Sequence, residues 1–206
     1  MKKYFLLFMI LQCSTILPQD LEYGIIVGKN FNTITSKPQN YNQTGENVDF
    51  NSRQSYNLGF ISTYKLSNYF DLSASLLYIN NIVSTNWSGP ADGNVDATLF
   101  YRYISLSPKL QITPILDLYL STGPTLDFNI DTKLELKGDY VTDSKEIPST
   151  EPLRIGANFC VGYKFYLFKG LSLAPEYSYD MGVSNTNKVY GGKYSTSRLS
   201  FIFFIN

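Results

Sequence analysis

Apolar and polar residues alternate one by one through long stretches of this chain. In residues 153–167 the odd positions carry Leu, Ile, Ala, Phe, Val, Tyr, Phe and Leu, and the even positions carry Arg, Gly, Asn, Cys, Gly, Lys and Tyr. A period of two places successive side chains on opposite faces of a strand, so one face is apolar and the other polar. Runs of about ten such residues between turn residues are typical of transmembrane β-barrels.

Eight stretches follow this pattern, and we predict a strand in each: 21–31, 54–66, 70–83, 97–106, 115–130, 153–167, 171–183 and 194–205. The predicted fold class is therefore all-β, a closed antiparallel eight-stranded transmembrane β-barrel with up-and-down connections, formed by a single domain of residues 20–206. Connections 32–53, 84–96, 131–152 and 184–193 are long, whereas 67–69, 107–114 and 168–170 are shorter. Outer-membrane barrels have short periplasmic turns and longer outside loops, which predicts both termini on the periplasmic side.

The size of the side chains predicts which face points outward. Eight strands with roughly five apolar positions each give about forty side chains, too many for the narrow interior of an eight-stranded barrel. The polar face carries glycines that relieve crowding there: Gly24, Gly28, Gly59, Gly123, Gly156, Gly162 and Gly182. The apolar face should therefore contact lipid, which disfavours the alternative of a secreted soluble ligand-binding barrel. Pro124 and Pro175 lie inside predicted strands, and we interpret them as bulge or rim positions.

The first nineteen residues resemble a secretory signal peptide. Lys2 and Lys3 precede an apolar run at 4–11, which is too short to span a membrane as a helix. We expect cleavage between Cys13 and Gln19. Lipidation of Cys13 is an alternative, although Gln12 before it fits a lipoprotein signal poorly. If Cys13 is removed, Cys160 alone remains, so a disulfide framework is excluded.

Composition excludes several kinds of function. The chain has 17 Lys and Arg against 17 Asp and Glu, so nothing in its net charge predicts binding to nucleic acid. It has no His, which excludes His-dependent catalytic triads and imidazole metal sites. No nucleophile or phosphate-loop motif is present. We therefore expect a protein that is not an enzyme and that has no cofactor or metal.

Nine charged residues share the parity that we predict to face the lumen: Glu22, Arg102, Asp117, Asp127, Arg154, Lys164, Glu176, Asp180 and Arg198. Both signs are present, and buried charges persist when they are paired and hydrogen-bonded. We interpret the set as a network that fills the lumen, with a narrow pore for small solutes or ions as the alternative. Cys160 has the same parity and should be a small lumen filler.

Three segments are similar to pieces of the small outer-membrane β-barrel proteins of Bacteroidetes, the PorT-like family: Tyr-Ile-Ser-Leu-Ser-Pro-Lys-Leu at 103–110, Tyr-Leu-Ser-Thr-Gly-Pro-Thr-Leu at 119–126, and Pro-Glu-Tyr-Ser-Tyr at 175–179. The resemblance implies a barrel in the outer membrane of a Gram-negative bacterium, with membrane lipid and the outer-membrane assembly machinery as partners. The chain ends in Phe-Phe-Ile-Asn, so its last residue departs from the usual terminal aromatic. The family supplies no catalytic residues, and we expect a role in membrane structure or in recognition through the long loops.

Overall fold

The computed structural model describes residues 21–35, 47–52, 54–89, 93–115, 117–138, 142–146, 151–184 and 193–205, and the regular structure in these ranges is β-strand. The strands are β1 (Leu21–Thr35), β2 (Asn47–Ser52), β3 (Gln54–Lys65), β4 (Phe70–Gly89), β5 (Gly93–Ile115), β6 (Leu118–Gly138), β7 (Thr142–Glu146), β8 (Leu153–Tyr163), β9 (Phe165–Phe168), β10 (Leu171–Gly182) and β11 (Lys193–Ile205). Across these ranges, no helix is long and apolar enough to span a membrane. The predicted signal peptide, residues 1–19, lies outside the described residues.

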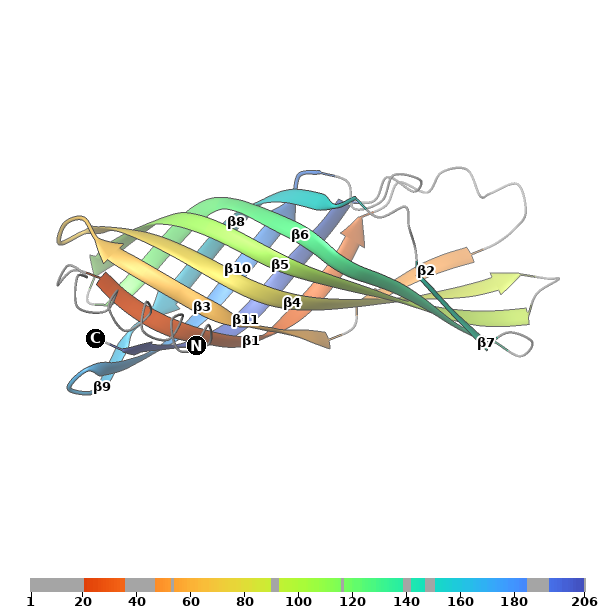
Figure 1. The fold of residues 1–206 in the computed structure, drawn as a ribbon, viewed down its shortest axis with the longest axis horizontal. Helices are drawn as coiled ribbons and strands as arrows, with labels where there is room; N and C mark the ends of the chain where they lie inside the picture. The colour runs from red at the N-terminus through yellow and green to blue at the C-terminus, as the bar shows by residue number, and fades with distance from the viewer. Residues whose placement is uncertain are drawn as a thin grey trace, which may run out of the picture.

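Eight of these strands close into a barrel (Figure 1). The order is β1, β3, β4, β5, β6, β8, β10 and β11, and each strand pairs antiparallel with the next. The last strand pairs back with the first, from Tyr23 opposite Ile205 to Thr35 opposite Lys193. The predicted fold class, a closed antiparallel eight-stranded barrel, is confirmed.

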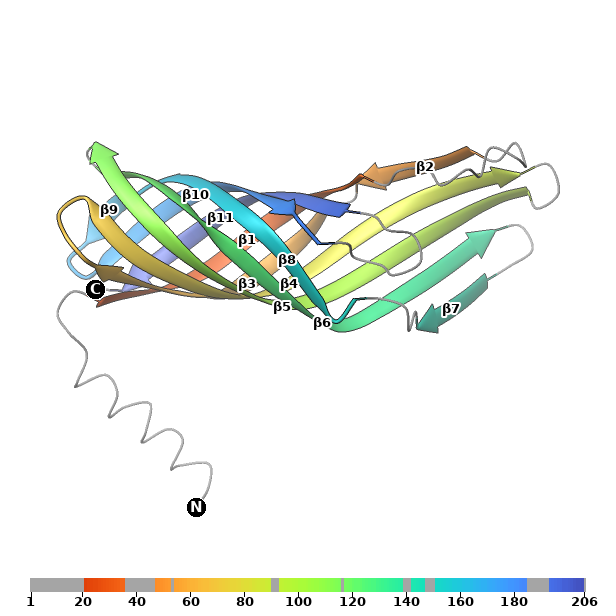
Figure 2. The ribbon, with the colours of Figure 1, turned by 90° about the horizontal axis from the view of Figure 1, so that it is seen from above.

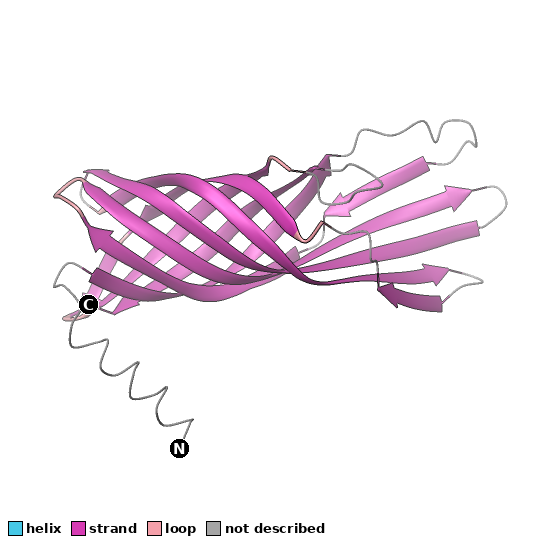
Figure 3. Cartoon of the chain, turned by 45° about the horizontal axis from the view of Figure 1, so that its top comes forward, coloured by secondary structure: helices cyan, strands magenta, loops and turns pink. Residues whose placement is uncertain are grey.

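Three strands continue well beyond the barrel at the end where the long connections lie (Figures 2 and 3). The ladder between β4 and β5 runs without a break to Gly89 opposite Gly93. β2 pairs with β4 and β7 pairs with β6, so five strands in the order β2, β4, β5, β6, β7 form a sheet there. Most of the predicted loop 84–96 is therefore strand, and parts of 32–53 and 131–152 are strand as well.

At the opposite end the turns are short, and those at 67–69 and 168–170 lie as predicted, whereas the turn between β5 and β6 lies further along the chain. β5 continues to Ile115, so the predicted loop 107–114 is strand and the turn lies around Asp117. The predicted strand 153–167 is interrupted at Lys164, whose backbone N–H donates to the carbonyl of Asp117 at 3.0 Å, and it resumes as β9.

Neither Pro124 nor Pro175 lies at a bulge, so the bulge part of that interpretation is wrong. Pro175 stands opposite Phe201 in an unbroken ladder, and Pro124 stands opposite Ala157 in another. The register shifts are elsewhere, between Arg102 and Tyr103, between Ile112 and Ile115, and between Leu171 and Ser172. Each proline lies where one neighbouring ladder has no pairing: the β5–β6 pairs stop between Leu106 and Leu110, and β10 pairs with neither β8 nor β9 at Pro175. The missing N–H is therefore not needed for a ladder hydrogen bond on that side.

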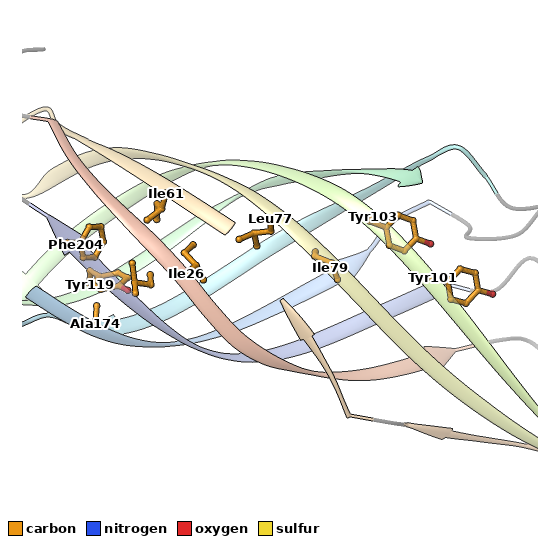
Figure 4. Close-up of a cluster of buried hydrophobic side chains, with 10 residues drawn as sticks. Ile26, Ile61, Leu77, Ile79, Tyr101, Tyr103, Tyr119, Ala174 and Phe204 are labelled. Atoms are coloured by element: carbon orange, nitrogen blue, oxygen red, sulfur yellow. The ribbon is translucent and has the colours of Figure 1, made fainter. Parts of the chain in front are cut away.

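Burial alternates along the strands as the pattern predicts, with β8 reading exposed, buried, exposed through most of its length. Large apolar side chains such as Phe60, Leu76 and Phe201 are exposed on the outer surface. The lumen is not wholly polar, however, because apolar side chains fill part of it (Figure 4): Ile26, Ile61, Leu77, Ile79, Tyr101, Tyr103, Tyr119, Ala174, Ile202 and Phe204. The barrel therefore has an apolar outer surface and a lumen that is filled by the inward-facing side chains of its strands.

The charged network inside the barrel

The largest group of buried charges comes from four neighbouring strands, and we call it the Arg154 cluster: Asp127 on β6, Arg154 on β8, Asp180 on β10 and Arg198 on β11. Arg154 pairs through one nitrogen with Asp127 and through the other with Asp180 at 3.4 Å. Arg198 pairs with the second oxygen of Asp180 at 2.7 Å. Asp180 thus lies between two guanidinium groups, and each charge in the cluster has an opposite charge beside it.

Neutral groups complete the Arg154 cluster. The Thr125 hydroxyl donates to Asp180 at 3.2 Å, and Arg154 donates to the backbone carbonyl of Tyr194 at 2.8 Å. The guanidinium of Arg154 also lies 5.2 Å from the centre of the Tyr194 ring, within the range of a cation–π contact. Because the side chain of Arg154 is only 2% exposed, these contacts replace the water that it gives up.

A second group, the Lys109 cluster, contains a residue that was absent from the predicted set. Lys109 on β5 lies 3.6 Å from Glu176 on β10, and it donates to the Cys160 sulfur at 3.1 Å. Tyr119 donates to the other oxygen of Glu176 at 3.1 Å, and the Cys160 thiol donates to Asn158 at 2.6 Å. Lys109 is buried and Cys160 has hydrogen-bond partners on both sides, so the thiol is part of the lumen packing.

At the short-turn end, Lys164 pairs with Glu22, which joins the segment between β8 and β9 to the first strand. The ammonium group also lies 4.7 Å from the centre of the Phe204 ring and 5.5 Å from that of Tyr166. Both partners are partly buried, so this pair lies at the mouth of the lumen.

Uncharged amides line the β1, β3 and β4 side of the lumen. Asn57 donates to Asn30, Asn30 donates to Asn81 at 3.4 Å, and Asn32 donates to Ser55 at 2.9 Å. These residues are buried. They continue the polar filling to the strands that contribute no charge to the two clusters.

Two of the nine predicted lumen residues lie elsewhere. Arg102 faces outward, because Tyr101 and Tyr103 on either side of it are buried. Its side chain is 37% exposed and pairs with Asp131 at 2.8 Å. Asp117 lies in the turn before β6 with a φ of 66°, where it is partly exposed. The other seven have the positions described above: Asp127, Arg154, Glu176, Asp180 and Arg198 buried, and Glu22 and Lys164 at the mouth.

The buried charges balance. Among the described residues, the cations Lys109, Arg154 and Arg198 and the anions Asp127, Glu176 and Asp180 are buried, three of each sign. Within the same ranges, no group of three or more Cys, Asp or Glu side chains could hold a metal ion. Several buried atoms have no protein partner, including Nε of Arg154, Nε of Arg198 and Oδ1 of Asp127. The geometry is that of a neutral, cross-linked filling.

The sequence matches the outer membrane protein beta-barrel domain over residues 13–188, which is most of the chain and includes seven of the eight barrel strands. The chain belongs to this outer-membrane β-barrel family. It is therefore a protein of the Gram-negative outer membrane, and the exposed apolar face of the barrel contacts lipid. The predicted location is confirmed.

Solved structures of small outer-membrane barrels are similar to this member of the family. Ail, the attachment invasion locus protein of Yersinia pestis, is 12% identical, with a TM-score of 0.46 over 91% of this chain and 100% of the other. Neisserial surface protein A is 12% identical, with a TM-score of 0.46 over 89% and 96%. OprG from Pseudomonas aeruginosa is 13% identical, with a TM-score of 0.45 over 90% and 96%. No curated protein matches the sequence.

Proposed function

We propose that this barrel is a non-enzymatic recognition protein that presents the five-stranded sheet and the long connections at the cell surface. The observation that carries the proposal is the continuation of β4, β5 and β6 beyond the barrel, with β2 and β7 added at the edges (Figure 3). Such strands are not needed to cross the bilayer, since a spanning strand requires only about 9–11 residues. β5 has 23 residues and β6 has 21, so about half of each is available for contacts outside the membrane.

The orientation follows from connection length. Short turns face the periplasm in outer-membrane barrels and long connections face outside. Both described ends of the chain, Leu21 and Ile205, lie at the short-turn end beside each other (Figure 2). A chain released from a signal peptide at residues 1–19 would begin on that periplasmic side, which agrees with the orientation that we propose.

The packed lumen argues for a supporting barrel and against a pore. Three groups occupy the interior together: the apolar cluster, which is the set of buried apolar side chains drawn in Figure 4, the Lys109 cluster and the Arg154 cluster. The interior of an eight-stranded barrel is just wide enough for side chains to fill it. A rigid, filled barrel of this kind would hold the projecting sheet at a fixed position above the membrane.

A site-specific photo-crosslinker tests the recognition role. We would place it at Gly89, where β4 ends in the projecting sheet, and at Lys169 in the short turn before β10 as the matched control. On intact cells exposed to their natural environment or to neighbouring cells, cross-links to extracellular material are expected from position 89 and not from 169. Equal labelling at the two positions, or labelling at 169 alone, contradicts the proposal.

We also propose membership of the PorT-like group of Bacteroidetes barrels. The three segments that resemble that group lie in strands that form the two lumen clusters: 103–110 in β5, 119–126 in β6 and 175–179 in β10. A source genome outside Bacteroidetes, or barrels of other groups with equal similarity at these three segments, would contradict the assignment.

A further inference from the structure

A row of small residues crosses the lipid-facing surface of β3, β4, β5 and β6. Ser62 stands opposite Ala74, and Ala74 stands opposite Pro108. Between β5 and β6, Leu106 pairs with Leu126 and Leu110 pairs with Thr122. This register places Pro124 on β6 opposite Pro108 on β5. All four side chains have outward parity.

Large apolar side chains stand on both sides of this row. Two residues away from the row on one side, a ridge is formed by Phe60, Leu76 and Leu106. Two residues away on the other side, a second ridge is formed by Tyr64, Leu72 and Leu110. All six are exposed. The small residues between the ridges leave a groove of about 530 Å³, bordered by Tyr64, Leu72, Leu110 and Thr122. Ligand clefts are commonly about 300–1,000 Å³ and mostly apolar, so this groove has the size of a binding site.

The two prolines fix the shape of the groove floor. The β5–β6 ladder has no pairing from Ser107 to Lys109, although the register is the same on either side. Neither Pro108 nor Pro124 has an N–H to donate to the other's carbonyl. The Ser107 hydroxyl instead donates to the carbonyl of Pro124 at 3.2 Å. A Cβ added at Gly123 would lie 2.0 Å from the carbonyl oxygen of Pro108, so the strands approach closely there.

We propose that this groove holds one acyl chain of a membrane lipid. It opens on the face that contacts the hydrocarbon of the outer membrane, and exposed apolar side chains surround it. Its floor crosses four strands, and three strand spacings are about 14 Å. A chain from one leaflet occupies about half of the roughly 30 Å hydrocarbon core, so a floor of this length can hold much of one chain that follows the tilt of the sheet.

A second copy of the barrel fits the groove less well. A stable interface buries on the order of 800 Å² per partner, whereas the groove is narrow and lies between two ridges. An extended acyl chain fits along the floor, beside the ridge of Tyr64, Leu72 and Leu110 that borders the groove. A bound acyl chain and a second copy of the barrel also give different results, because only the acyl chain is detected by lipid photolabelling and only the second copy changes the oligomeric state.

The test uses the full barrel reconstituted in vesicles that contain a phospholipid with a diazirine-labelled acyl chain. After photolysis, peptide mass spectrometry is expected to find several-fold more labelling around Ser62, Ala74 and Leu110 than around Phe201 and Leu199, which are exposed on β11. Ser62→Leu and Ala74→Leu should each reduce the groove labelling to the level of β11. Ser195→Leu is the matched control, because it adds the same bulk at an outward position of β11 and should leave the groove labelling unchanged.

Labelling that is uniform around the barrel in the unsubstituted protein overturns the proposal without reference to any variant. Groove labelling that persists in both Ser62→Leu and Ala74→Leu overturns it as well, once heat-modifiable gel migration has shown that both variants are folded. Light scattering that finds a dimer, converted to a monomer by Ala74→Leu, would assign the groove to a second copy instead.

Discussion

A single buried residue, Arg154, connects more of the lumen than any simple ion pair would. Its guanidinium contacts two carboxylates, one backbone carbonyl and one aromatic ring, which belong to three other strands. We predict that Arg154→Leu destabilises the barrel by about 3–5 kcal/mol, because Asp127 and Asp180 would then be short of a positive partner in a buried place. Urea or heat unfolding in one detergent, followed by gel migration, measures the loss.

Lys29→Leu is the matched control for Arg154→Leu. Lys29 is exposed on the outer face near the middle of β1, because β1 continues to Thr35, beyond the predicted end at Phe31. Its ammonium donates to Gln54 at 3.2 Å. A lipid-facing Lys costs up to roughly 2–4 kcal/mol at the bilayer midplane, so its replacement by Leu should be neutral or stabilising. A larger loss from Lys29→Leu than from Arg154→Leu would mean that the inner and outer faces are assigned wrongly.

The alternation of positions along a strand predicted correctly which residues face the lumen where the two faces differ in polarity. It failed where both faces carry large apolar side chains. Arg154 and Asp180 lie on strands with clear alternation, and both are buried. Residues 99–104 read Leu-Phe-Tyr-Arg-Tyr-Ile, with large apolar side chains on both faces. The inward tyrosines there displaced Arg102 to the outer side. Lys109 was missed because the predicted strand ended at residue 106, which placed 109 in a connection, whereas β5 continues to Ile115.

At the level of elements, the close approach of β5 and β6 near Pro108 depends on Gly123, which has no side chain. A methyl group at Gly123 would overlap the carbonyl of Pro108, whereas at Gly24 the nearest atoms are 3.0 Å away. We predict that Gly123→Ala lowers stability by about 1–3 kcal/mol and that Gly24→Ala costs clearly less, because a methyl group 2.0 Å from a carbonyl oxygen must push the backbone aside, whereas contacts at 3.0 Å require much smaller shifts. The temperature at which gel migration changes compares the two variants. Equal temperatures would show that the seam tolerates the methyl group.

Strand existence could be predicted from the sequence, but strand length could not. Each of the eight barrel strands has an apolar face that must contact lipid, which gives a period of two. Beyond the membrane that requirement disappears. The sequence of β2, Asn-Val-Asp-Phe-Asn-Ser, and that of β7, Thr-Asp-Ser-Lys-Glu, therefore read as loop. Their pairing with β4 and β6 is a tertiary property.

For the whole molecule, the orientation in the membrane can be measured directly. We predict that an epitope tag inserted after Gly89 is bound by antibody on intact cells, and that the same tag inserted after Lys169 is bound only after the outer membrane is permeabilised. Gly89 ends the projecting β4, and Lys169 lies in a short turn at the opposite end of the barrel. The reverse pattern would place the projecting sheet in the periplasm.

The whole barrel should also be closed to ions. We predict that the purified protein, inserted in planar bilayers, shows no large and stable conductance, because the apolar cluster and both charged clusters occupy the lumen. Insertion is verified by heat-modifiable migration of protein recovered from the same preparation. Reproducible channels of porin size would favour the alternative of a pore for small solutes.

The arrangement of the Arg154 cluster also bears on the order in which the barrel is assembled. Its three ion pairs join strands that are neighbours in the sheet, with partners 27, 26 and 18 residues apart in the chain. A growing open sheet of β6, β8, β10 and β11 can neutralise these charges before it curls. By contrast, Glu22 and Lys164 are 142 residues apart and come from the first strand and the β8–β9 segment. That pair requires the edges to meet, whereas the charges of the Arg154 cluster can be compensated while the sheet is still open.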